Sequence, residues 1–294
     1  MRLSLRFGLI AVLVLALAGT TLAATPPRPP GVQVKPLRAY PNQAPGQTTN
    51  GSFTVTNNTD QPQDVSFSAE RFKTVDEDYN YAFDKDIITD WVDFKSPTMS
   101  LKPKQSQVQN YTIAVPADAT PGGRYIALLT SVTPKSDEQS VTQINRVASL
   151  IYLEVTGKIT RTVQLLSVDV PSFTAKPQVE TTMRLANTGN SHYRARVGLS
   201  VGRWPSTNNI LKSQPETVLL PGTVRKISET INLPKMPGVY KVTAIFSPPQ
   251  GGGTSLTRTI VYAPLWFVGL VIGMMGGLIL LAVRWRSYRK KRRQ

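Results

Sequence analysis

Hydrophobic and polar residues alternate in short runs along most of the chain, and turn-forming residues separate the runs. Apolar side chains fall on one face of each run, and none has the i, i+3, i+4, i+7 spacing of an amphipathic helix. In the first half the runs are residues 31–34, 51–56, 65–70, 108–113, 125–129 and 149–155. Turn signals recur about every 8–12 residues, which is typical of antiparallel sandwiches. This half is therefore predicted to form a β-sandwich.

A second set of runs begins after Gly157 and has the same character. The runs are residues 162–168, 179–187, 193–201, 224–233, 238–246 and 256–262, with a hairpin loop at residues 248–253. Residues 55–59 (VTNNT) and 185–189 (LANTG) both end a strand in Asn-rich turn chemistry. We therefore predict an all-β chain of two tandem immunoglobulin-like β-sandwich domains, residues 31–157 and 158–262.

The C-terminal end has a different pattern. Leu265–Val283 contains no charged residue, aromatic residues flank it, and a basic cluster follows directly. We predict a single transmembrane α-helix over residues 263–283 and a basic cytoplasmic tail over residues 284–294. Because basic flanks stay in the cytoplasm, both sandwiches are expected on the outer side of the cell membrane.

Glycines recur every fourth residue in the predicted helix, at Gly269, Gly273 and Gly277. This spacing places them on one face, where a second helix can approach closely. Self-association through this face is therefore a hypothesis, although Gly is common in membrane helices in any context.

The N-terminal end is predicted to be a signal peptide. Arg2 and Arg6 precede a short apolar core, and small residues lie where a signal peptidase would cut after Ala23. Residues 1–23 are thus expected to be removed, and residues 24–30 form a Pro-rich leader that holds the first domain away from its neighbours.

Composition and charge narrow the possible functions. The 294 residues include no Cys and one His, His192, which excludes thiol nucleophiles, disulfide frameworks and multi-histidine metal sites. Of the 34 basic residues, nine lie in the two termini, leaving 25 against 18 acidic residues between them, a net charge of +7. The large overall charge of +16 therefore does not indicate nucleic-acid binding.

Residues in four places carry a resemblance to a known family. They are residues 31–36 (GVQVKP), 53–57 (FTVTN), 121–125 (PGGRY) and 146–153 (RVASLIYL). In these residues and in the order of its segments, the chain resembles the WxL-interacting surface proteins of Gram-positive bacteria. The resemblance implies that the first domain binds peptidoglycan and the second binds a partner surface protein. Periplasmic pilus chaperones share a similar early Asn-ended strand and a late Arg-led strand.

Few residues of the sequence indicate catalytic chemistry. Residues 198–202 match the Gly-x-Ser-x-Gly pattern, but they lie in an alternating strand, and the only His precedes the Ser, against the hydrolase order. His192 is interpreted as a polar turn residue. We predict no enzyme activity, no catalytic residue, no cofactor-binding residue and no metal site.

Residues 76–93 are rich in carboxylates and aromatic rings. Calcium binding is left open here, although an EF-hand's sixth-position Gly and twelfth-position Glu are missing. A solvated hairpin insertion is the favoured interpretation, and glycoside cleavage by paired carboxylates lacks a recognisable cleft. The aromatic residues are a candidate contact surface for carbohydrate or peptide, or else core filling: Tyr79, Tyr81, Phe83, Trp91 and Phe94.

The sequence thus predicts a membrane-anchored extracellular scaffold that binds cell-wall polymer, another surface protein, or both. The alternative is a chaperone that assists assembly of secreted subunits by strand exchange. The ligand, the domain that binds it and the oligomeric state stay undetermined, and the lack of Cys favours a bacterial origin.

Overall fold

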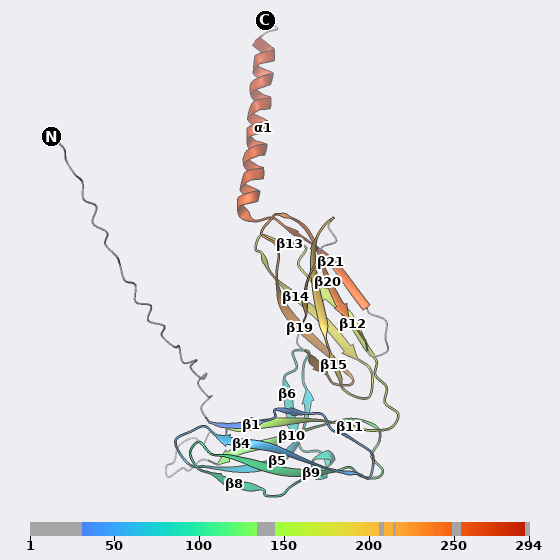
Figure 1. Ribbon diagram of the computed structural model, residues 1–294. Helices are drawn as coiled ribbons and strands as arrows, with labels where there is room; N and C mark the ends of the chain where they lie inside the picture. The colour runs from blue at the N-terminus through green and yellow to red at the C-terminus, as the bar shows by residue number, and fades with distance from the viewer. Residues whose placement is uncertain (1–30, 134–144, 206–208, 214–215, 249–253, 292–294) are drawn as a thin grey trace, which may run out of the picture.

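The computed structural model describes residues 31–133, 145–205, 209–213, 216–248 and 254–291. Within these ranges it is mostly β-structure, ending in one long helix, which confirms the predicted fold class. Figure 1 shows a first sandwich lying across the bottom of the view, a second standing on it, and the helix leaving the far end of the second. The predicted signal peptide and Pro-rich leader, residues 1–30, lie outside the described residues.

Two sheets build the first sandwich. One has the order β1 (Val32–Lys35), β4 (Thr48–Asn57), β9 (Ser106–Ala114), β7 (Val92–Phe94). The other has the order β2 (Arg38–Ala39), β11 (Arg146–Val155), β10 (Gly122–Thr133), β5 (Gln63–Thr74), β6 (Tyr81–Asp84), with β3 (Asn42–Gln43) on β11 and β8 (Thr98–Leu101) on β5. A short 3-10 helix, η1 (Ile87–Trp91), precedes β7. Between the sheets lies a core that includes Phe53, Ile113, Leu128 and Leu153.

The second sandwich faces a three-stranded sheet against a five-stranded one. The first sheet is β12 (Val163–Asp169), β14 (Gln178–Asn187), β19 (Thr223–Asn232). The second is β13 (Phe173–Thr174), β21 (Thr254–Tyr262), β20 (Gly238–Phe246), β16 (Val197–Arg203), β17 (Asn209–Ser213), and β15 (Tyr193–Ala195) pairs separately with β18 (Thr217–Leu219). The core includes Met183, Leu199, Tyr240 and Phe246.

Each long strand lies on one of the predicted runs, except that the run at residues 193–201 is divided. Tyr193–Ala195 pairs with β18, whereas Val197–Arg203 pairs with β17 and β20, so the strand breaks at Arg196 where its partners change. Apart from β1 and β15, which lie on predicted runs, the strands of two to five residues were not predicted, because so few residues carry no detectable period.

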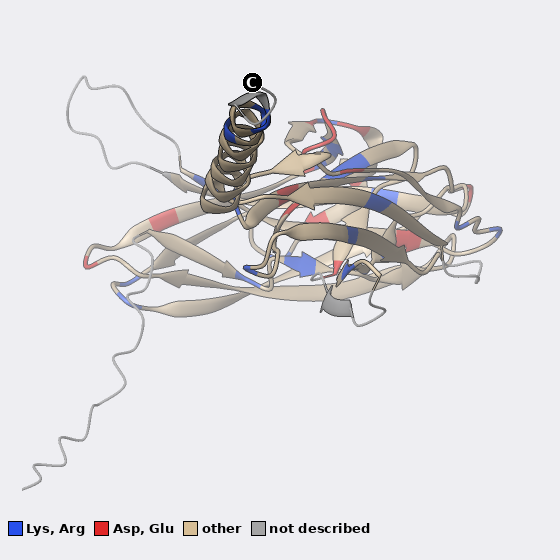
Figure 2. Ribbon diagram, turned by 90° about the horizontal axis from the view of Figure 1, so that it is seen from above, with Lys and Arg blue, Asp and Glu red and all other residues tan. Residues whose placement is uncertain are grey.

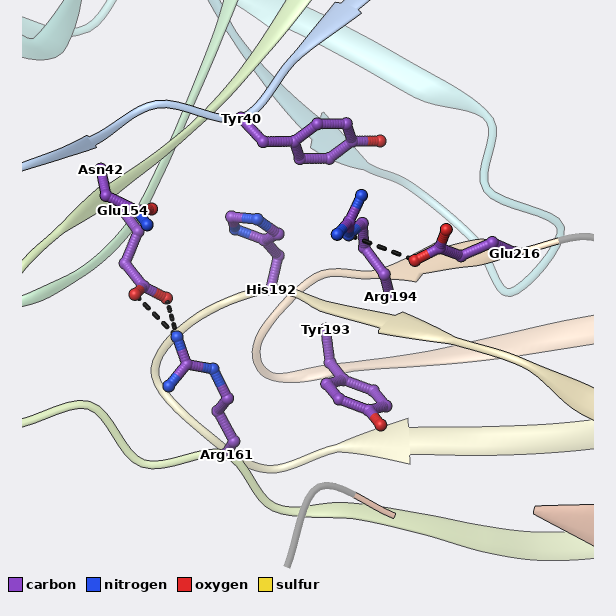
Figure 3. Close-up of a pocket in the computed structure, with 8 residues that line it drawn as sticks. All are labelled: Tyr40, Asn42, Glu154, Arg161, His192, Tyr193, Arg194 and Glu216. Atoms are coloured by element: carbon purple, nitrogen blue, oxygen red, sulfur yellow. Dashed lines mark hydrogen bonds and ion pairs between the residues drawn. The ribbon is translucent and has the colours of Figure 1, made fainter. Parts of the chain in front are cut away.

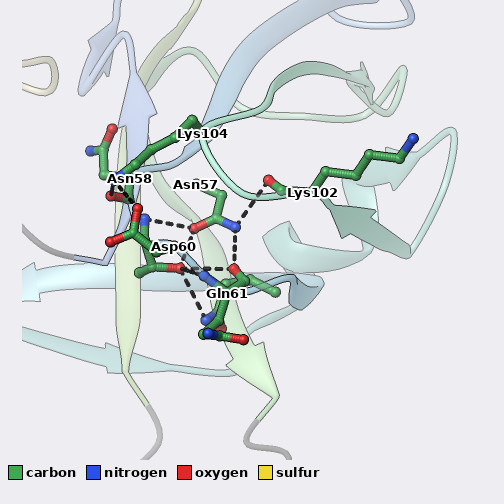
Figure 4. A network of polar contacts seen from close by, with 8 residues as sticks. Asn57, Asn58, Asp60, Gln61, Lys102 and Lys104 are labelled. Carbon is green, nitrogen blue, oxygen red and sulfur yellow. Dashed lines mark hydrogen bonds and ion pairs between the residues drawn. The ribbon is translucent and has the colours of Figure 1, made fainter.

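The two Asn-rich segments, residues 55–59 and 185–189, form equivalent turns. Asn57 ends β4, and its amide nitrogen donates to the carbonyls of Gln61 and Lys102 while its side-chain oxygen accepts from the Thr59 backbone (Figure 4). Asn187 ends β14, and it donates to Ser191 and Leu219 and accepts from Gly189. Both Asn side chains are buried, so each fixes the turn that follows its strand.

The C-terminal helix, α1 (Leu265–Lys291), is longer than predicted. It continues past Val283 through the basic residues, because Arg and Lys are good helix formers and no Gly or Pro follows Gly277 before its end. At about 1.5 Å per residue, its 27 residues exceed a hydrocarbon core of about 30 Å. Among the described residues, α1 is the one helix long and apolar enough to cross a membrane. Figure 2 shows the basic positions gathered toward its C-terminal end.

Candidate functional site

The predicted aromatic contact residues do not form one surface. Tyr79 and Tyr81 pack into a cluster at the junction of the two sandwiches. Trp91 and Phe94 pack against the core of the first sandwich, and Phe83 alone is exposed, at 41%. Tyr79 is buried and Tyr81, Trp91 and Phe94 are partly buried, so the five rings do not share one exposed face, and their role as a contact surface for carbohydrate or peptide stays a prediction.

Tyr79 anchors the β5–β6 hairpin of the first sandwich to the second. Its hydroxyl lies 2.8 Å from the backbone nitrogen of Leu220, which donates to it, and 2.7 Å from the hydroxyl of Thr223. The guanidinium of Arg225 lies over its ring, 4.1 Å from the centroid. Burial raises the pKa of Tyr79, so it stays neutral in this contact.

Acidic residues of the same hairpin pair with bases of the second sandwich. Glu77 accepts from Arg184, which lowers the pKa of the Glu77 carboxyl, and Asp78 pairs with Lys226 at 2.8 Å. Further along, Asp84 pairs with Arg71 of β5, which lowers its pKa. Among the described residues, no three acidic or histidine side chains come together as metal ligands. The carboxylates instead tie the hairpin to neighbouring strands.

The PGGRY word, residues 121–125, lies at the same junction. Gly122 has φ +138°, and a Cβ there would lie 2.8 Å from the carbonyl oxygen of Asn190 in the second sandwich. A Cβ on Gly123 would overlap the hydroxyl of Tyr125, and the Gly123 backbone nitrogen donates to the same Asn190 carbonyl. The glycines therefore allow β10 to begin directly against a turn of the second sandwich.

A cavity of about 340 Å³ opens beside this junction. Figure 3 shows the imidazole of His192 and the guanidinium of Arg194 beneath the ring of Tyr40, and the guanidinium lies over that ring, 5.1 Å from its centroid. Tyr40 stacks on Tyr152 with centroids 5.1 Å apart, and His192 lies 5.6 Å from Tyr152 and 6.0 Å from Tyr125. The lone histidine thus lies among three tyrosine rings supplied by the first sandwich.

Ion pairs line the polar side of the cavity. Glu154, which is 7% exposed, accepts from Arg161 at 2.7 Å through both oxygens and from the hydroxyl of Ser191 at 2.5 Å. Glu216 accepts from Arg194 at 3.2 Å. Each carboxylate already faces a guanidinium, so the cavity suits a polar or zwitterionic group better than a bare ion.

Burial lowers the pKa of His192 to about 4, although the Glu154 carboxylate favours its charged form. Its Nδ1 is buried and has no hydrogen-bond partner within the described structure. At neutral pH the imidazole is therefore uncharged. The interpretation of His192 as a polar turn residue does not fit its packing among these rings, for which the sequence contained no signal.

A strand edge of the first sandwich is the second notable feature. β11 pairs with β10 along its whole length, but on its other side β2 and β3 pair only with Leu150–Ile151 and Glu154–Val155. The Leu150 backbone nitrogen donates outward to Leu37. By alternation, the backbone groups of Arg146 and Ala148 face the same way. Among the described residues, no strand pairs with this stretch on that side.

The structure also shows where the Gly-x-Ser-x-Gly match and the three helix glycines lie. Gly198–Gly202 lies within β16 and not at a strand-to-helix turn, and Ser200 is buried at 5% exposure. Gly269, Gly273 and Gly277 lie on α1 with open space around each, so pairing through them stays a prediction.

No protein-family model and no curated protein matches this chain. Solved structures with a similar arrangement include CfaA, a class 5 fimbriae chaperone, at 11% identity and TM-score 0.40, covering 79% of this chain and 100% of that one. Another is the CsuC–CsuE chaperone–tip adhesion subunit complex from Csu pili of Acinetobacter baumannii. Its sequence identity is 11% and its TM-score 0.40, and the match covers 79% of this chain and 99% of that one. The E. coli chaperone DraB matches with 12% sequence identity and a TM-score of 0.39, over 79% of this chain and 98% of that one. Likeness at this level assigns this chain no ligand or partner.

Proposed function

We propose that this protein is a membrane-tethered binding protein that captures an extended segment of a secreted or surface polypeptide by strand pairing. The open edge of β11 at Arg146–Ser149 carries the proposal. Unpaired backbone groups at a sheet edge are a template for another strand, and adding a strand is a recurring mode of peptide recognition.

The side chains of this stretch suit such a partner. Val147 is half-buried against the core of the first sandwich, and Ala148 is half-buried against the cluster at the junction. Apolar groups thus lie on both faces of the strand, and an incoming strand that pairs with β11 would continue both surfaces. Arg146, which pairs with Glu70, adds charge at the end of the edge.

The helix sets where the capture takes place. We infer that α1 crosses the cell membrane with its basic C-terminal end in the cytoplasm, so that both sandwiches lie outside. β11 belongs to the sandwich that lies farther from α1 (Figure 1), which keeps its open edge away from the bilayer. A tether of this kind holds a captured polypeptide at the outer surface of the membrane.

A protein partner fits the described residues better than a wall polymer. Sugar recognition usually needs exposed aromatic rings, and four of the five candidate rings are packed. The resemblance to WxL-interacting proteins implies a surface protein as the partner of the second domain and peptidoglycan as the ligand of the first. Peptidoglycan binding by the first sandwich is therefore the competing hypothesis in the test below.

The test replaces Ala148 with Pro in the full-length, tagged chain expressed in its native host. Proline removes the outward N–H and blocks pairing, while the N–H of a residue facing outward takes no part in the bonds to β10. Ala148→Thr is the matched control, because Thr keeps the N–H and favours strands. Captured polypeptides are quantified by mass spectrometry after purification, and each variant is also pelleted with purified peptidoglycan.

The proposal predicts a set of secreted polypeptides that co-purify with the wild type and with Ala148→Thr but fall at least about tenfold with Ala148→Pro. Equal recovery from all three proteins would refute strand capture at this edge. Salt-resistant pelleting with peptidoglycan by all three, without enriched polypeptides, would support the wall-polymer hypothesis instead.

A further inference from the structure

A row of exposed apolar side chains crosses four strands of the second sandwich. Phe173 of β13 pairs with Val261 of β21, and Val261 pairs with Val239 of β20. Arg203 lies opposite Tyr240, which places Trp204 opposite Val239, and the Trp204 backbone nitrogen donates to the Val239 carbonyl. These four side chains, Phe173, Val261, Val239 and Trp204, are between 36% and 57% exposed and are called the apolar row.

The rest of this sheet face is polar near the row. The next row along the same three long strands consists of Thr259, Lys241 and Gly202, and the one after it of Thr257, Thr243 and Ser200. Apart from Ile245, which is 40% exposed nearer the other end of β20, the large apolar residues exposed on the described part of this face are those of the row, and such a group in contact with water requires a specific explanation.

That end is the one from which α1 leaves. Val261 lies four residues before Leu265, the first residue of α1, and the Ala263 backbone nitrogen donates to Thr174 of β13. Figure 1 shows β13 beside the base of the helix. If α1 spans a bilayer, the row lies within a few residues of the level at which the helix enters the lipid.

Exposed basic residues lie within four residues of members of the row in the sequence, and they are called the basic rim. Lys176 follows β13, Lys235 precedes β20, and Arg203 ends β16, and all three are exposed. The described stretches that contain them, residues 170–177, 203–205 and 233–239, hold no Asp or Glu. The guanidinium of Arg203 donates to the carbonyl of Pro237, which holds it beside the row.

We propose that the apolar row and its basic rim dock on the headgroup layer of the bilayer that contains α1. Trp and Phe favour this layer, and Lys and Arg are attracted to anionic lipids. Docking places the end of the second sandwich from which α1 leaves against the membrane and so fixes the direction in which the first sandwich extends. The inference goes beyond the proposed function and rests on its claim that α1 spans the membrane.

The test uses the full chain in liposomes. Each variant carries one introduced cysteine labelled with an environment-sensitive fluorophore, and labelling is specific because the chain has no native Cys. The probe site is Val239→Cys. Ile245→Cys is the matched control, because it is on the same face of β20, exposed to a similar extent, and about 20 Å farther along the strand. Met274→Cys, within α1, reports insertion. Quenching by lipids with a nitroxide near the headgroup is measured with and without anionic phosphatidylglycerol.

We expect quenching at position 239 to be several-fold greater than at 245, to increase with phosphatidylglycerol, and to fall when Phe173 and Trp204 are both replaced by Ser. Equal, weak quenching at 239 and 245 while position 274 is quenched by a nitroxide deep in the acyl chains would overturn docking and leave the membrane anchor intact. An absence of quenching at 274 would instead overturn the anchor on which both proposals rest. A signal at 239 that depends on the protein-to-lipid ratio and not on the nitroxide lipid would assign the row to a second copy of the chain, against the proposal.

Discussion

Acidification is expected to weaken the junction between the sandwiches through His192. The imidazole lies among the rings of Tyr40, Tyr125 and Tyr152, and burial lowers its pKa from 6.5 to about 4. The charged groups that act on it are Glu154, which favours the cation, and Arg161 and Arg194, which oppose it. Protonation would place a positive charge in a buried site, where the loss of hydration outweighs the attraction of the Glu154 carboxylate.

The sign and size of the effect follow from linkage. Between pH 6.5 and about 4 the unfolded chain binds a proton that the folded chain does not, so stability is fully present above pH 6.5 and falls as the pH decreases. Each pH unit in this window costs about 1.4 kcal/mol, so the free energy of unfolding at pH 5 should be about 2 kcal/mol lower than at pH 8.

Urea unfolding of the full chain in mild detergent, followed by near-ultraviolet circular dichroism at pH 5 to 8, measures this change. His192→Gln, which cannot charge, should remove most of the dependence in this range, because carboxylates with ordinary pKa values titrate mainly below it. A wild-type transition that stays constant from pH 8 to 5, or a variant that loses as much stability as the wild type, would refute the assignment of a buried neutral imidazole.

Three further predictions concern single contacts. Tyr79→Phe leaves the backbone N–H of Leu220 buried without its acceptor and should lower the free energy of unfolding by about 1–3 kcal/mol, whereas Phe83→Leu at the exposed ring should have little effect. Asn187→Ala removes three hydrogen bonds from the buried turn and should destabilise by about 2–4 kcal/mol in thermal unfolding; a loss below about 0.5 kcal/mol would contradict this role. Gly273→Ile should lower self-association of α1 in a membrane reporter assay, and unchanged signal would remove the helix-pairing hypothesis.

The long strands of both sandwiches could be predicted because each has one face in a core and one toward solvent. β4, β9 and β20 show that alternation over nine or ten residues. The β15–β16 break could not be predicted, since it depends on which strands pair with each part. The extension of α1 past Val283 was missed because charge ends an apolar pattern without ending a helix.

Less of the candidate site than of the fold could be predicted from the sequence. The sequence shows the PGGRY segment, but the reason for Gly122 is its close approach to the carbonyl of Asn190, 68 residues away. Tyr79 was singled out as a contact residue, and its partners belong to the other sandwich. Composition identified the aromatic and acidic character of residues 76–93, whereas the topology decides that Glu77, Asp78 and Tyr79 of this segment join the two sandwiches.

The central claim is that β11 accepts a partner strand at its open edge, and photo-cross-linking at that edge tests it most directly. A photoreactive residue at Ala148 in the full-length chain, activated in intact cells, should give a discrete polypeptide adduct sensitive to protease and resistant to muramidase. The same residue at Thr54, which is on β4 between β1 and β9, should give none. An adduct at Ala148 that muramidase alone releases, or equal adducts at both positions, would contradict the account.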